Sequence, residues 1–171
     1  MENNKNGRTD TISKMNIIEA KQEHYEEVCE LFKLLDLLHI DIAPGRIREF
    51  SGPARSKARY QQYTDGEKNV LFLAQDKNQF VGFINLMLID VPEEAMNIKR
   101  KFALLDNIFV REAYQNEGIA TQLMDIAEAW AKDKGASKIE LQLYTNNEKA
   151  LQFYQSMGFN PFMALMERNV K

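Results

Sequence analysis

The sequence predicts a mixed α/β fold (α+β), in which a central sheet of about six or seven strands packs against helices. Three observations predict it. Segments with apolar residues at spacings of three and four, typical of amphipathic helices, alternate with segments rich in strand-forming residues. Some strand segments are separated only by a turn, whereas others have a helix between them. The chain has 171 residues, of which 44% are hydrophobic, and this suits one domain.

The N-terminal part is predicted to contain a tail, a strand and a helix. Residues 1–14 are almost entirely polar and are expected to form a mobile tail, so that one domain would span residues 15–171. A short strand is expected at residues 16–20. The next segment predicts an amphipathic helix, because its apolar residues are three and four positions apart. These residues are Tyr25, Val28, Cys29, Phe32, Leu35 and Leu38.

The segment at residues 44–63 has little periodicity. Pro-Gly and Gly-Pro pairs interrupt it, so we expect a loop with one or two short helices. The segment is also locally basic, which is typical either of a solvated surface or of a wall of a ligand pocket. The basic residues are Arg46, Arg48, Arg55, Lys57 and Arg59.

A β-hairpin and a further strand are predicted in the middle of the chain. Residues 70–74 and 80–89 are rich in strand-forming residues, and the polar residues 75–78 supply the turn between them. A charged connector at residues 91–101 follows. Residues 102–110 are the next strand candidate.

The remaining elements alternate between helices and strands. A helix is expected at about residues 119–134, with an apolar face and Gly135 as its stop. Residues 137–144 alternate strictly between apolar and polar, which predicts a strand with one buried face. A second helix should follow and end at Gly158, and residues 159–170 are expected to supply the last strand or strands. Either of two residues can cap the second helix, namely Thr145 and Asn147.

Composition argues against several classes of protein. A single cysteine cannot form a disulfide within the chain, and with only two histidines we expect no metal site. No apolar run approaches the ~20 residues that span a bilayer, and the first ten residues do not resemble a signal peptide. We therefore expect a cytoplasmic protein without a membrane partner. The net charge of −3 argues against nucleic acid as the partner.

The segment from Leu105 to Thr121 carries the clearest chemical signal. A strand ends, a loop with Gly118 follows, and a helix begins. Backbone N–H groups at a helix start lack intrahelical partners, and the helix dipole adds positive potential, so the segment can hold a pyrophosphate. A glycine allows close approach of a ligand, and Ala120 keeps the next turn small. Taken alone, this signal is weak, and the segment is more typical of a simple tight turn.

Two motifs together resemble the GNAT superfamily of N-acetyltransferases. The first is Gln115-x-x-Gly118-x-Ala120, which matches the acetyl-CoA signature of that family. The second begins at Asn147-Glu148-Lys149-Ala150, continues with Phe153-Tyr154 and ends with Gly158-Phe159. The resemblance implies a twisted mixed sheet flanked by helices on both faces, with the fourth and fifth strands of the sheet splayed around acetyl-CoA. It also implies direct transfer of the acetyl group to a primary amine of a small molecule or peptide.

The resemblance also implies where acetyl-CoA binds. Backbone groups near the end of the fourth strand would hold the pantetheine arm and polarise the thioester carbonyl. Residues at the start of the following helix would hold the pyrophosphate. Asn147 would contact the coenzyme or simply cap its helix. The strand residues are Ile108, Phe109 and Val110, and the loop and helix residues are Gln115, Asn116, Glu117, Gly118, Ile119, Ala120 and Thr121.

Two residues are candidates for proton transfer. The resemblance implies that Tyr154 acts as general acid and gives a proton to the departing sulfur. The alternative is that Tyr154 only packs and that its hydroxyl is bonded elsewhere. Asp106 is a candidate general base or else an ordinary carboxylate on the strand surface. Strand alternation predicts that Asp106 lies on the same side as Ile108 and Val110, unless a bulge intervenes.

Other chemically active side chains are expected to be structural. His24 and His39 are predicted to be surface or partly buried residues, and Cys29 to be a core thiol. The acceptor site would be built by residues 37–63. The main alternative to an enzyme is a non-catalytic acetyl-CoA-binding sensor or interaction module, and a homodimer is one option that the sequence leaves open.

Overall fold

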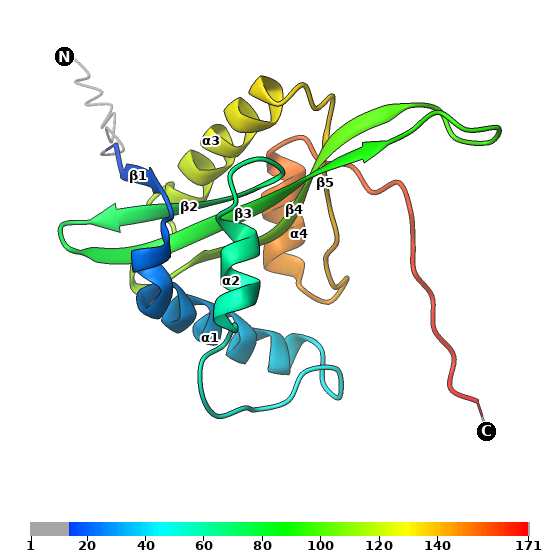
Figure 1. The fold of residues 1–171 in the computed structure, drawn as a ribbon. Helices are drawn as coiled ribbons and strands as arrows, with labels where there is room; N and C mark the ends of the chain where they lie inside the picture. Colours follow the sequence, from blue (N-terminus) through cyan, green and yellow to red (C-terminus); the bar gives the residue numbers. More distant parts are fainter. Residues whose placement is uncertain (1–13, 171) are drawn as a thin grey trace, which may run out of the picture.

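The computed structural model describes residues 14–170, so all of the predicted N-terminal tail except Lys14 lies outside the described residues. The described chain forms a five-stranded mixed sheet in the order β1-β2-β3-β4-β5 (Figure 1). Strands β1 to β4 pair antiparallel in sequence order, and β5 pairs parallel with β4. The strands are β1 (Asn16–Glu19), β2 (Asn69–Asp76), β3 (Gln79–Val91), β4 (Arg100–Val110) and β5 (Ile139–Leu141).

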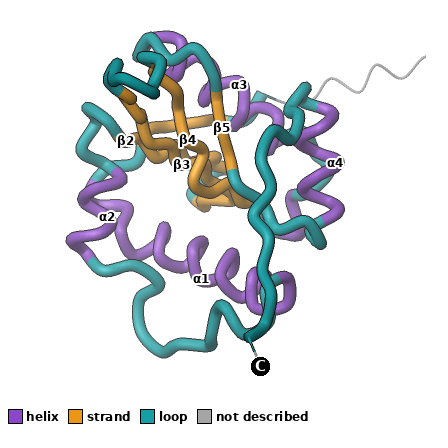
Figure 2. Tube along the Cα trace, turned by 90° about the vertical axis from the view of Figure 1, so that its right-hand side faces the viewer, coloured by secondary structure: helices purple, strands orange, loops and turns teal. Residues whose placement is uncertain are grey.

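Two helical layers cover the two faces of this sheet, which confirms the predicted fold class (Figure 2). Helices α1 and α2 pack on one face, whereas α3 and α4 pack on the other. The α-helices are α1 (Tyr25–Ile42), α2 (Lys57–Tyr63), α3 (Ile119–Asp133) and α4 (Glu148–Ser156), and the short 3₁₀ helices are η1 (Gln22–His24) and η2 (Glu112–Tyr114).

The core between the sheet and α1 and α2 is centred on Phe32. Its ring lies 4.4 Å from that of Phe83 on β3 and 5.6 Å from that of Tyr63 on α2, measured between ring centroids. Cys29 is buried in the same core, with its Sγ atom 3.5 Å from the carbonyl oxygen of Arg55. This is the structural role that the apolar spacing of α1 predicts for Cys29.

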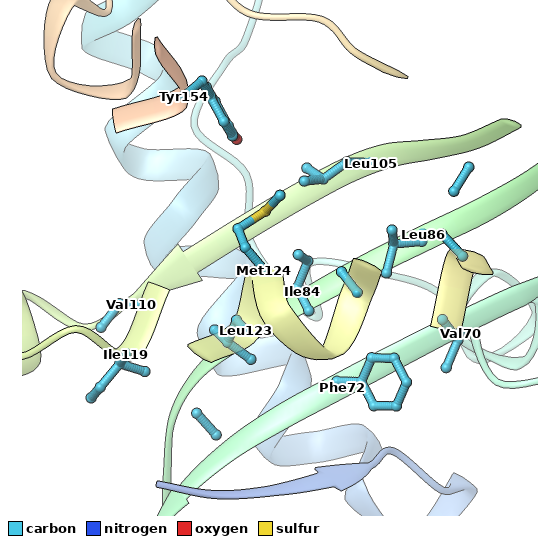
Figure 3. Packing of buried hydrophobic residues seen from close by; sticks show 14 of the residues in the cluster. Val70, Phe72, Ile84, Leu86, Leu105, Val110, Ile119, Leu123, Met124 and Tyr154 are labelled. Carbon is cyan, nitrogen blue, oxygen red and sulfur yellow. The ribbon is translucent and has the colours of Figure 1, made fainter. Parts of the chain in front are cut away.

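The second core lies between the sheet and α3 and α4 (Figure 3). Leu123 and Met124 of α3 are fully buried against Ile84 and Leu86 of β3 and against Leu105 of β4. Burial of side chains of this size contributes roughly 1.5–3 kcal/mol each. The helix is therefore held to the sheet by the apolar face that the sequence predicts.

Strands β3 and β4 approach closely at Gly82. A Cβ atom at this position would lie 2.6 Å from the carbonyl oxygen of Phe109. We expect Gly82→Ala to lower the free energy of unfolding by about 1–3 kcal/mol, because β4 would have to shift. Denaturant titration measures this change. The control is Asp90→Ala, at an exposed position of the same strand, with an expected change within about 0.5 kcal/mol. A Gly82→Ala variant as stable as the control would contradict the prediction.

The sheet has fewer strands than predicted. Strand β5 is confined to residues 139–141, although the alternation extends over residues 137–144. Residues 159–170, the predicted last strand or strands, form neither helix nor strand, so this part of the prediction is wrong. The segment contains Pro161, which lacks a backbone donor, and Val170 is its only β-branched residue. Apart from Phe159, which packs against the core, its large apolar side chains are exposed, namely Phe162, Met163, Leu165, Met166 and Val170.

Among the helices of residues 14–170, none combines the length and apolar character that a bilayer span requires.

Candidate active site

The loop between β4 and α3 ends in a helix start with backbone donors that the helix itself does not use. Asn116 and Gly118 adopt left-handed backbone conformations, with φ of 67° and 76°. The helix's own ladder begins with the hydrogen bond from Gln122 N to Gly118 O, at 3.1 Å. The N–H groups of residues 119–121 precede that bond, and the helix dipole makes this end positive. The arrangement is suited to a diphosphate anion.

The side chain of Gln115 fixes the beginning of this loop. Its Nε2 atom donates to the carbonyl oxygen of Val110 at 3.0 Å. Its Oε1 atom accepts a hydrogen bond from Nζ of Lys149 on α4. The loop that begins at Gln115 and runs to Thr121, predicted from one motif, is thus in contact with the helix that carries the second motif.

The end of β4 is open on the side of β5. The two strands pair only from Ala103 to Leu105, so the later residues of β4 have no strand beside them on that side. The predicted pantetheine residues Ile108, Phe109 and Val110 lie in this part. The side chains of Phe109 and Val110 belong to opposite cores, so contacts at this edge would involve backbone groups, of which the Val110 carbonyl oxygen already accepts from Gln115 Nε2. The two strands part where the resemblance implies that the coenzyme lies.

A bulge in β4 changes the position of Asp106. The register passes from Asn85 opposite Asn107 to Leu86 opposite Leu105, so that Asp106 is an extra residue in β4. The prediction that Asp106 shares a side with Ile108 and Val110 is therefore wrong. Those two residues pack toward α3 and α4. The Asp106 carboxylate instead contacts Asn85, which alternates with residues of that core and faces the α1 side.

Two amide side chains orient the Asp106 carboxylate. Its Oδ2 atom accepts hydrogen bonds from Nδ2 of Asn85 at 3.2 Å and from Nδ2 of Asn107 at 2.9 Å. Asn107 Nδ2 also lies 3.1 Å from Oδ1 of Asn85. Asp106 itself is exposed, whereas Asn85 is fully buried and is the only buried polar residue among those described. The other carboxylate oxygen, Oδ1, accepts no hydrogen bond from a described residue.

Sequence reasoning missed Asn85 and Lys149. Asn85 was recognisable as the one polar residue in the apolar run between Phe80 and Ile89. Lys149 lies inside the second motif, but its contact with Gln115 depends on how α4 is placed against the loop.

Tyr154 has a buried ring and a hydroxyl without a hydrogen-bond partner among the described residues. Its side chain is 7% exposed and packs between Phe153 and Phe159, with ring centroids 5.4 Å and 5.5 Å away. The ring extends from α4 toward the sheet, with the oxygen at its inner end (Figure 3). Burial raises the pKa of Tyr154 to about 12. The phenol therefore stays protonated at neutral pH, and its proton is not committed to a described residue.

Asn147 acts as the N-cap of α4. Its Oδ1 atom accepts a hydrogen bond from Ala150 N at 3.2 Å, so Asn147 and not Thr145 begins the helix. Capping by this bond occupies the side-chain oxygen and leaves the amide nitrogen without a contact to a described residue.

The remaining candidates are tied into the fold. Nδ1 of His24 accepts a hydrogen bond from Lys21 N at 3.1 Å. His39 packs edge-on against Tyr144, 6.2 Å between ring centroids, and burial lowers its pKa. In the basic segment, Arg55 pairs with Asp36 at 2.6 Å. Residues 14–170 contain no cluster of three or more His, Cys, Asp or Glu side chains that could hold a metal ion.

Comparison with known proteins identifies the class. The family model described as "Acetyltransferase (GNAT) family" matches residues 34–159. The chain belongs to this family of acyltransferases, as the two motifs predict.

Curated relatives are also named as N-acetyltransferases. N-alpha-acetyltransferase 30 of Schizosaccharomyces pombe is 26% identical over 143 residues, which is 84% of this chain and 82% of that protein. Human N-acetyltransferase 8 is 27% identical over 99 residues, or 58% of this chain. The matched segments span less than half of some relatives, 42% of human N-acetyltransferase 8 and 23% of the N-acetyltransferase YobR of Bacillus subtilis.

Solved structures confirm the fold. A mutant of the BH1408 protein from Bacillus halodurans superposes with a TM-score of 0.86 at 25% identity, over 92% of this chain and 100% of that one. The aminoglycoside N-acetyltransferase AAC(6')-Iy in complex with CoA has a TM-score of 0.69 at 17% identity, over 91% of this chain and 99% of that one.

Proposed function

We propose that this protein is an acetyl-CoA-dependent N-acetyltransferase that transfers the acetyl group directly to a primary amine of a small molecule or peptide. One observation carries the proposal. The loop that joins the unpaired end of β4 to the start of α3 is bonded, through Gln115 and Lys149, to the helix that carries Tyr154. The N–H groups at the start of α3, the unpaired edge of β4 and the hydroxyl of Tyr154 are the three features that a thioester-bearing coenzyme needs.

The coenzyme would be held mainly by backbone groups. The N–H groups at the start of α3 suit the pyrophosphate, because they add no side-chain entropy and face an anion with the helix dipole behind them. Backbone groups of Ile108, Phe109 and Val110 would hold the pantetheine arm and polarise the thioester carbonyl. Fixed donors of this kind stabilise the developing oxyanion without reorganisation.

The acceptor amine would approach from the α1 side of the sheet. The Asp106 carboxylate is exposed on that side, with its free Oδ1 atom available to an ammonium group. The C-terminal end of α1 adjoins the loop after β5, since Asn146 Nδ2 donates to the carbonyl oxygen of Ile42 at 2.6 Å. This contact and the packing of His39 on Tyr144 would form a wall of the acceptor site.

Two proton transfers complete the reaction. The amine must lose a proton to attack the thioester carbon, and Asp106 would take it directly or through water. The C–S bond then breaks as the carbonyl re-forms, and Tyr154 would give its proton to the leaving thiolate. No covalent enzyme intermediate is needed.

Asp106→Asn should lower kcat/KM for the amine by roughly 10²–10⁴-fold, because it removes the proton acceptor while keeping the shape of the side chain. Initial rates with acetyl-CoA and the preferred amine measure the loss. The matched control is Asp90→Asn on β3, with no expected change. If the two variants were equally active, Asp106 would be an ordinary surface carboxylate.

The experiment that tests the function combines binding and turnover. Calorimetry with CoA and acetyl-CoA should give saturable binding at one site. Release of the CoA thiol should then be measured over a panel that contains a polyamine, an aminoglycoside, an amino acid derivative and a peptide with a free N-terminus. Binding without turnover on any amine would favour the sensor alternative, and absence of binding would refute both.

A further inference from the structure

Lys149 is the positive charge in direct contact with the predicted diphosphate loop. Its Nζ atom donates to Oε1 of Gln115, thirty-four positions away in the chain. The bond is to a neutral amide, and among residues 14–170 no carboxylate forms an ion pair with Lys149. Lys149 is exposed. The ammonium group is therefore held at the loop while its charge remains uncompensated.

The position of Lys149 is unfavourable for α4 itself. It is the second residue of the helix, directly after Glu148, and Asn147 caps the helix end. A helix N-terminus carries partial positive charge, which favours acidic and disfavours basic side chains in the first turn. Helix stability therefore does not account for a lysine here. A residue that is unfavourable for the helix in which it lies is typical of a functional position.

The loop between β4 and α3 also has little positive charge of its own to attract an anion. It contains the carboxylates of Glu112 and Glu117, both exposed. The nearest cation in sequence is Arg111, whose Nε atom donates to the carbonyl oxygen of Phe80 at 3.0 Å and is thus directed to the sheet. Backbone N–H groups supply only partial charges, so a diphosphate in this loop gains a full opposite charge from α4.

We propose that Lys149 binds the coenzyme diphosphate, exchanging its bond to the Gln115 amide oxygen for bonds to phosphate oxygens. This inference rests on the proposed function. Lys149 is a binding and positioning residue, because it would contact the diphosphate and not the thioester. It lies on the helix that carries Tyr154, so the same contact ties the predicted proton donor to the bound coenzyme.

Lys149→Gln tests the proposal. We expect the Kd of CoA to rise about tenfold at low ionic strength, since a charge-assisted hydrogen bond is lost. The difference from the unchanged protein should shrink as salt is raised from about 50 to 200 mM, because salt screens an exposed charge. Lys149→Arg should retain most of the affinity. The matched control is Lys138→Gln, at an exposed lysine whose side chain forms no hydrogen bond or ion pair with a described residue, and its Kd for CoA should not change.

A thioester without a diphosphate separates binding of the anion from a structural effect. With S-acetyl-pantetheine as donor, KM should be the same for Lys149→Gln and the unchanged protein. The melting temperature of the variant should be equal or higher, because the first turn of α4 loses an unfavourable cation.

Three outcomes would overturn the proposal. If Lys149→Gln bound CoA as tightly as the unchanged protein, the proposed function would stand and this inference would fail. The same holds if its KM for S-acetyl-pantetheine rose by the same factor as the Kd of CoA. Failure of the unchanged protein to bind CoA would overturn the proposed function and this inference together.

Discussion

Replacing Tyr154 with phenylalanine is expected to lower kcat by roughly 10²–10⁴-fold, because the variant cannot give a proton to the leaving thiolate. The hydroxyl has no hydrogen-bond partner among the described residues, so its removal leaves no buried group unpaired. We therefore expect the free energy of unfolding to change by less than about 0.5 kcal/mol and the Kd of CoA to stay the same. Steady-state kinetics, calorimetry and denaturant titration measure the three quantities.

The raised pKa of Tyr154 adds a pH criterion. Because burial raises the pKa to about 12, the side chain keeps its proton where a free tyrosine, with a pKa near 10, would begin to lose it. The rate of the unchanged protein should therefore not fall between pH 8 and pH 10 through ionisation of Tyr154. Phe153→Leu, next to it on α4, is the control for packing. A Tyr154→Phe variant with normal kcat would show that Tyr154 only packs, and loss of CoA binding would indicate a structural role.

A carboxylate at the start of α3 is expected to remove most of the affinity for the coenzyme. In Thr121→Glu the new charge would stand beside the N–H groups predicted to hold the diphosphate. Two like charges about 4 Å apart repel by about 1 kcal/mol in water and about 4 kcal/mol near a protein surface. The Kd of CoA should thus rise by between about fivefold and several hundredfold. Calorimetry at low ionic strength gives the largest difference.

Measurements of thermal stability distinguish this loss of affinity from unfolding of the variant. Thr121 is exposed and lies in the first turn of α3, where an acidic side chain is favourable for the helix. The melting temperature of Thr121→Glu should therefore be unchanged or higher. The glutamine in Thr121→Gln has nearly the same shape as glutamate but carries no charge. The Kd of CoA for this variant should stay within about twofold of that for the unchanged protein. Equal affinities of the two variants would place the diphosphate elsewhere.

Local patterns predicted most of the fold because they are set by burial. The apolar face of α3 and the hairpin of β2 and β3 follow from spacing and turn residues alone. The end of the chain was predicted wrongly for a physical reason. A strand exists only if its backbone groups pair with a neighbouring strand, and residues 160–170 form no backbone–backbone hydrogen bond with another described residue. Alternation or apolar content cannot reveal whether a neighbour is present.

The candidate site, like the fold, could be predicted from the sequence only in part. The loop from Gln115 to Thr121 was predictable, because a glycine before a helix and the motif around it are local in sequence. The orientation of Asp106 was not, since the bulge arises from the register between β3 and β4. Asn85 and Lys149 gain their significance from contacts across the sheet and between α4 and the loop. Such contacts are properties of the tertiary arrangement.

Burial of the chain's only sulfhydryl has a practical consequence. Cys29 is 5% exposed and lies on the buried face of α1, against the loop that leads to α2. A thiol-specific dye added to the intact molecule therefore meets no accessible sulfur, and colour that develops during turnover comes from the released coenzyme. The same dye will label the polypeptide once α1 detaches from the sheet, so the chain carries a built-in reporter of its own unfolding.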